Sequence, residues 1–96
     1  MKDIARYNQP IMVTRSIIAQ KLDSYLQGSE TVEQLVDWAE RALMDDELDP
    51  AYIEVVSDAL ARIGLADVRE FGLTWRDCQE VLMRLGYRAR VQVSVV

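Results

Sequence analysis

The chain has 96 residues, half of them hydrophobic, with 16 Asp+Glu against 11 Lys+Arg and a net charge of -5. This length predicts one domain over residues 1–96, since domains most often hold roughly 100–150 residues. The single cysteine excludes an intramolecular disulfide framework and a cysteine-cluster metal site. The absence of histidine removes the commonest general base and zinc ligand.

The first thirteen residues are expected to be an extended segment that ends in Ile11, Met12 and Val13. They contain no export signal, because polar residues and Pro10 interrupt any apolar stretch. Apolar stretches elsewhere in the chain fall far short of the ~20 residues that span a bilayer. The chain is therefore expected to be cytoplasmic, with no membrane partner.

Four helices are predicted between residues 14 and 86. Thr14 is a good N-cap for a first helix over 15–27. Thr31 and Gln34 form the pattern of a capping box, which begins a second helix that ends near Met44.

The starts and ends of the last two helices are also indicated by single residues or short motifs. Asp49 followed by Pro50 predicts the start of a third helix, which Gly64 ends. Thr74 begins a fourth helix, and Gly86 ends it. The apolar residues predicted to face the core recur at helical spacing. They are Ile18, Leu22 and Tyr25; Val32, Leu35, Val36, Ala39 and Leu43; Tyr52, Ile53, Val56, Ala59, Leu60 and Ile63; and Trp75, Cys78, Leu82 and Leu85.

Residues 87–96 change to a period of two, which is typical of a half-buried strand. The apolar positions are Tyr87, Ala89, Val91, Val93 and Val95. A strand must pair, because its backbone amides and carbonyls need partners. Three alternatives stay open: pairing with residues 11–13, pairing with the same segment of a second subunit, or disorder. The predicted fold is mainly α: a compact bundle of four main helices with a C-terminal β-strand.

Negative charge is concentrated in residues 29–54, which hold nine acids and one base, Arg41. One interpretation is a solubilising face. The other is a docking surface for a basic protein, since complementary charge speeds association and rejects wrong partners. The candidate partner-binding residues are Asp37, Glu40, Asp45, Asp46 and Glu47, with Trp38 and Tyr52 as aromatic anchors.

The sequence gives little indication of metal binding, nucleophilic catalysis or nucleic-acid binding. The acids of residues 45–49 are contiguous and lack the mid-loop glycine of a calcium loop. Cys78 lies on an apolar face without a histidine to activate it, which favours a core cysteine. The acidic balance opposes nucleic-acid binding by the bases near the C-terminus. We expect no metal, cofactor or catalytic residue, so an enzyme ranks behind an interaction module and a homodimeric structural module.

Several short motifs resemble those of small uncharacterised bacterial helical proteins, some of which are toxin-immunity proteins. The motifs are Val13-Thr14, Leu35-Val36-Asp37-Trp38-Ala39, Gly72-Leu73-Thr74 and Leu85-Gly86-Tyr87. They span most of the chain, and no site residue is carried over from them. The resemblance implies a non-enzymatic role in which the acidic middle of the chain faces a basic toxin or nuclease.

Overall fold

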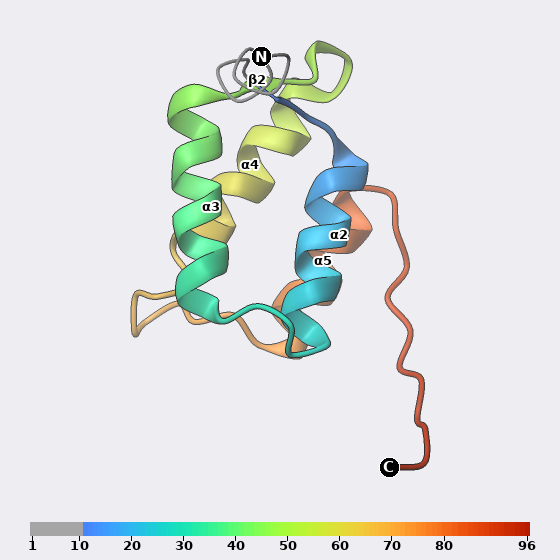
Figure 1. The fold of residues 1–96 in the computed structure, drawn as a ribbon. Helices are drawn as coiled ribbons and strands as arrows, with labels where there is room; N and C mark the ends of the chain where they lie inside the picture. The colour runs from blue at the N-terminus through green and yellow to red at the C-terminus, as the bar shows by residue number, and fades with distance from the viewer. Residues whose placement is uncertain (1–10) are drawn as a thin grey trace, which may run out of the picture.

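The computed structural model describes residues 11–96, in which four α-helices form a bundle (Figure 1). The helices are α2 (Arg15–Leu26), α3 (Val32–Asp45), α4 (Ile53–Gly64) and α5 (Trp75–Arg84). The predicted mainly helical bundle is confirmed. Residues 1–10 of the expected extended segment lie outside the described residues.

Threonine side chains cap three of the helices, as the sequence predicts. The hydroxyl of Thr14 accepts a hydrogen bond from the Ile17 amide at 3.3 Å. Thr31 forms the predicted capping box with Gln34 at the start of α3. Each of these bonds satisfies a first-turn amide that has no partner within its helix.

The start of α5 is also fixed by a capping box, between Thr74 and Asp77. The Thr74 amide donates to Asp77 Oδ2 at 2.8 Å, and this bond holds the pKa of Asp77 below its usual value. Arg62 of α4 adds an ion pair to the same carboxylate at 3.2 Å and donates to the Gly72 carbonyl at 3.0 Å. These contacts fix α5 against the end of α4.

The third helix begins later than the sequence predicts. Asp49 caps a short 3₁₀ helix, η1 (Pro50–Tyr52), and α4 starts only at Ile53. Within η1 the Tyr52 amide donates to the Asp49 carbonyl at 3.1 Å, which is the tighter i to i+3 pattern. The change of pitch turns Tyr52 and Ile53 toward solvent, so their predicted places in the buried stripe were wrong.

The core lies between the four helices and includes at least one residue from every helix. The fully or almost fully buried apolar residues are Val13, Ile18, Leu22, Leu35, Val36, Ala39, Ala42, Val56, Ala59, Leu60, Ile63, Ala66, Leu73, Cys78, Val81, Leu82 and Leu85. Four predicted core residues, Leu43, Tyr52, Ile53 and Trp75, are exposed instead, and Tyr25 and Val32 are half-buried against the core. Trp75 is the first residue of α5, at the edge of the bundle, and it is 39% exposed.

Residues 12–13 are extended, as predicted, but they pair with a segment other than the C-terminal tail, whose pairing with them was one of three alternatives. Strand β1 (Met12–Val13) pairs in parallel with β2 (Glu47–Leu48), with Met12 opposite Glu47 and Val13 opposite Leu48. The Asp49 amide extends the pairing by donating to the Val13 carbonyl at 3.0 Å. The acidic segment after α3 is therefore the partner that β1 uses.

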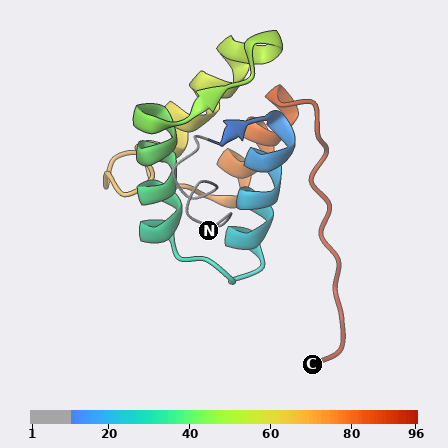
Figure 2. The same ribbon diagram turned by 45° about the horizontal axis from the view of Figure 1, so that its top comes forward.

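The C-terminal strand predicted over residues 87–96 is not formed in this chain. In residues 11–96 the two-stranded β1–β2 sheet is the whole of the sheet structure, and the tail after α5 is drawn as an extended chain without a partner (Figure 1). The tail leaves α5 beside the start of α2 and runs toward the opposite end of the bundle from β1 and β2 (Figures 1 and 2). This direction carries it away from residues 11–13, so the alternative in which the tail pairs with those residues is not observed.

Candidate protein-binding surface

The outer face of α3 carries an acidic stripe. Glu33, Asp37 and Glu40 follow one another at helical spacing and are exposed, as is Asp45 at the end of the helix. Asp37 lies 3.4 Å from Arg41, but both side chains are largely exposed, so this pair contributes little to stability. The helix thus presents a row of solvated carboxylates with one nearby cation.

The remaining predicted acids continue this stripe beyond the helix. Asp46 is the C-cap of α3, and Glu47 is the first residue of β2. Because β2 pairs with β1, the backbone at Glu47 has a fixed position opposite Met12. We call Asp37, Glu40, Asp45, Asp46 and Glu47 the acidic surface.

An exposed methionine lies within the acidic surface. Met44 is 81% exposed, and it occupies the positions i+4 from Glu40 and i+7 from Asp37. Its side chain therefore shares the outer face of α3 with those carboxylates. Met44 was not among the residues expected at this site, although the same helical spacing that groups the acids also places it among them.

Trp38, the first predicted aromatic anchor, points toward α2 instead of the acidic stripe. Its side chain is half-buried, and Lys21 Nζ of α2 lies 5.3 Å from the ring centroid. Lys21 also forms an ion pair with Glu30 at 3.3 Å. The indole is therefore part of the α2–α3 contact and is a poor candidate for the centre of a docking surface.

Tyr52, the second predicted anchor, is covered on one face by a cation. The Arg15 guanidinium carbon lies 3.8 Å from the centroid of the tyrosine ring, a favourable cation–π distance. Arg15 also donates to the Leu85 carbonyl at the end of α5, at 3.2 Å. This side chain links η1, α2 and α5, which gives Tyr52 a structural role that the sequence did not indicate.

The predicted strand-pairing residues begin along one side of the bundle, and the tail then runs on past the end of the helices (Figures 1 and 2). Tyr87 and Ala89 begin the tail, and Ala89 is half-buried against the core. Val91, Val93 and Val95 are 71%, 90% and 100% exposed. The tail keeps its apolar positions exposed because no neighbouring strand covers them within the described residues.

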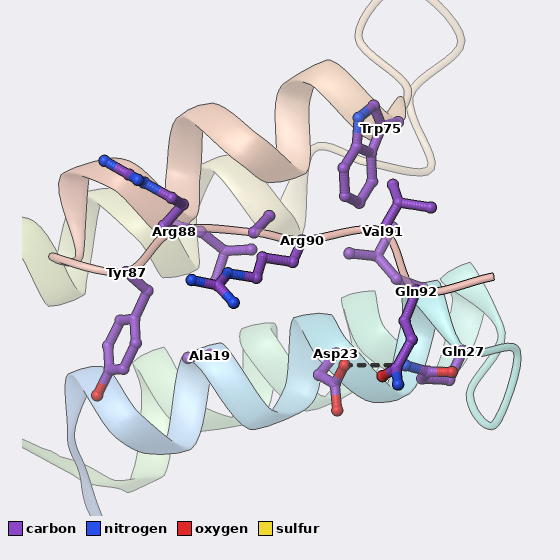
Figure 3. Close-up of a pocket in the computed structure, with 12 residues that line it drawn as sticks. Ala19, Asp23, Gln27, Trp75, Tyr87, Arg88, Arg90, Val91 and Gln92 are labelled. Carbon is purple, nitrogen blue, oxygen red and sulfur yellow. Dashed lines mark hydrogen bonds between the residues drawn. The ribbon is translucent and has the colours of Figure 1, made fainter.

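A cavity of about 430 Å³ separates the tail from α2 and α5 (Figure 3). Leu26 of α2 and Leu82 and Trp75 of α5 give it apolar walls, and the tail closes it with Val91. The close-up shows the Trp75 ring beside Val91, with Asp23 and Gln27 on the α2 side, where Gln27 Nε2 donates to Asp23 Oδ1 at 3.3 Å (Figure 3). The volume is within the range of roughly 300–1,000 Å³ that is usual for ligand pockets.

Cys78 has the position predicted for a core cysteine. It is fully buried in the middle of α5, and burial raises the pKa of its thiol to about 11. The thiol is therefore protonated at neutral pH, whereas thiolate is the nucleophilic form. Its contribution is packing.

In residues 11–96, no group of three or more Cys, Asp or Glu side chains has the arrangement of a metal site. No helix of the same residues has the length and apolarity needed to cross a membrane. Known protein-family models, characterised proteins and solved structures gave no match to this chain. The resemblance to immunity proteins thus stays a prediction.

Proposed function

We propose that the protein is a non-enzymatic interaction module that binds a basic protein through its acidic surface. The observation that carries this proposal is the exposure of Met44 among solvated carboxylates on one helix face. An apolar contact surrounded by charge is the usual arrangement of a specific interface, with a hydrophobic centre and a polar rim.

The two kinds of side chain would serve different steps of binding. Carboxylates at the rim attract a cationic partner and raise the association rate, an effect that salt screens. Met44 is flexible and polarizable, and it can adapt to the apolar part of that partner. A toxin or nuclease with a basic surface, which the resemblance to immunity proteins implies, is one partner with this chemistry.

Reversing the charge of Asp37, Glu40 and Asp45 to lysine should weaken partner capture from an extract of the source cells at low salt. We expect at least a tenfold loss of recovered partner, equivalent to about 1.4 kcal/mol of binding free energy. The wild-type complex should elute as salt is raised, because the rim charges are exposed. Quantitative pull-down over a salt series measures both effects.

The matched control reverses three exposed acids elsewhere, Asp67, Glu70 and Glu80, and so makes the same change in net charge. This control should keep the partner. A further variant, Met44→Ala, should lose it without any change of charge. Equal recovery by the acidic-surface variant and the control would contradict the proposal, as would a wild-type protein that captures no partner.

A second candidate function is favoured by the exposed valines of the tail. We propose that two copies of the chain form a homodimer by pairing residues 87–96 across a two-fold axis. The tail supports this proposal with an alternating apolar face and with backbone groups that no strand of residues 11–96 satisfies.

Light scattering coupled to size-exclusion chromatography should give the wild-type protein a mass of twice the chain mass of 11.0 kDa. Val93→Lys should shift the mass to that of the monomer, because the cation enters the apolar face of the paired tails. Ser94→Lys, one residue away on the polar face, should remain dimeric. A wild-type monomer, or a dimer that persists in Val93→Lys, would refute pairing through the tail.

A further inference from the structure

The groove between α2 and α5 provides the surface on which paired tails can lie. The tail follows this groove as far as Gln92, and the cavity beneath it is lined both by apolar side chains and by polar ones that include Asp23 and Arg90 (Figure 3). Trp75 stands at its edge and is 39% exposed, although it is a large aromatic side chain. An isolated two-stranded ribbon is at best marginally stable in water, so paired tails need a supporting surface of this kind.

The first residues of the tail determine which of its faces is turned toward the groove. Ala89 is half-buried and packs against the core, whereas Arg88 and Arg90 on either side are exposed. In an extended chain alternate residues point the same way. In a regular strand Val91, Val93 and Val95 share the side of Ala89, but in the single chain only Val91 lines the cavity, and Val93 and Val95 are 90% and 100% exposed beyond it.

We propose that, in the homodimer, the groove of each subunit receives the tail of the other, with Val95 of the partner subunit packed beside Val91 against Trp75. This inference rests on the proposed pairing of the tails and adds the surface that receives them. Trp75 is then an interface residue, which accounts for a partly exposed indole at the edge of the monomer.

The two-fold axis makes this arrangement self-consistent. In an antiparallel pair centred on Val93, Val91 lies opposite Val95 and Gln92 lies opposite Ser94, so the three odd-numbered valines of both tails are on one face of the ribbon. A two-fold axis perpendicular to the plane of the ribbon exchanges the two tails but keeps each face of the ribbon on the same side. Both helical bundles therefore lie on the apolar face of the ribbon. Each groove then meets the start of its own tail and the end of its partner's tail.

The area involved is close to that of a specific interface. A fully buried aliphatic side chain removes roughly 60–120 Å² of apolar surface from water. The three odd-numbered valines and the groove surface they cover then contribute roughly 400–700 Å² per chain before the paired backbones are counted. Standard interfaces bury roughly 800 Å² per partner, so the valine face and the groove supply at most about half to nine-tenths of that area, and the paired backbones must add to it.

Tryptophan fluorescence tests the contact directly. The chain has two tryptophans, so a Trp38→Phe background leaves Trp75 as the sole emitter. Over about a hundredfold dilution series, in which a dimer dissociates, the Trp75 emission of the concentrated protein should lie at shorter wavelength than that of the dilute protein. If Trp38→Phe does not fold, the Trp75 signal is obtained by subtracting the spectrum of Trp75→Phe from that of the wild type.

The variants separate this inference from the proposal on which it rests. In the Trp38→Phe background, Val95→Lys should be monomeric by light scattering and should show the long-wavelength Trp75 emission at every concentration. Ser94→Lys in the same background should behave like the Trp38→Phe parent protein in both measurements. A parent dimer whose Trp75 emission equals that of the Val95→Lys monomer would overturn the groove contact and leave tail pairing intact. A parent that is monomeric throughout, or a Val95→Lys variant that stays dimeric, would overturn both.

Discussion

Leu60→Ala should lower the free energy of unfolding by about 2–5 kcal/mol, the usual cost of removing a buried leucine side chain and leaving a cavity. Leu60 has no exposed surface and belongs to α4, which packs against both α3 and α2. Total stability of a domain is only about 5–15 kcal/mol. Urea denaturation followed by circular dichroism should therefore show a clear drop in the transition midpoint.

Leu65→Ala is the matched control, since it makes the same chemical change just after the same helix. Leu65 is 38% exposed, so less apolar surface is lost from the core and the remaining space is open to water. Its transition midpoint should stay much closer to that of the wild type. Equal losses in the two variants would contradict the burial of Leu60.

Arg15→Ala should cost about 2–3 kcal/mol of stability, because one side chain makes two favourable contacts. A hydrogen bond from a charged donor contributes about 1.5–3 kcal/mol, and a cation–π contact about 0.5–2 kcal/mol. Both are present here, to the Leu85 carbonyl at 3.2 Å and to the Tyr52 ring at 3.8 Å. The Leu85 carbonyl lies at the C-terminal end of α5, where the helix dipole also favours a cation.

Two further variants divide this effect in the same denaturation experiment. Tyr52→Leu removes the ring and leaves the hydrogen bond, so it should lose only part of what Arg15→Ala loses. Arg15→Lys keeps the charge but lacks the planar guanidinium that can stack and donate at once, so it should recover only part of the stability. An unchanged midpoint in Arg15→Ala would show that the contacts to Tyr52 and Leu85 do not stabilise the fold.

Three of the four helix starts were predictable because their signals are local, whereas the start of α4 was placed too early. Thr14, Thr31 and Thr74 each cap amides within three residues, so their chemistry is complete within a short stretch of sequence. The acids of the candidate site were also found from sequence, since helical spacing alone groups Asp37 with Glu40. Met44 was predictable by the same rule.

The features that the sequence did not predict depend on contacts between distant residues. Strands β1 and β2 are two residues long, too short to show a periodic pattern, and they meet across more than thirty residues of chain. Lys21 and Arg15 reach Trp38 and Tyr52 from a different helix, so neither aromatic side chain could be assigned its surroundings from its own segment. The alternation in the tail fits a strand, but alternation cannot specify the partner.

The parallel pair β1–β2 affects the order in which the acidic surface forms. Helices α3 and α4 are neighbours in sequence and pack closely, and local contacts of this kind form early in folding. The pairing of β1 with β2 closes a far longer loop and adds only a two-residue ladder. Short ladders open locally without global unfolding. Opening of this ladder would release the backbone at Glu47 from its position opposite Met12 while α3, which carries Asp37 and Glu40, stays folded.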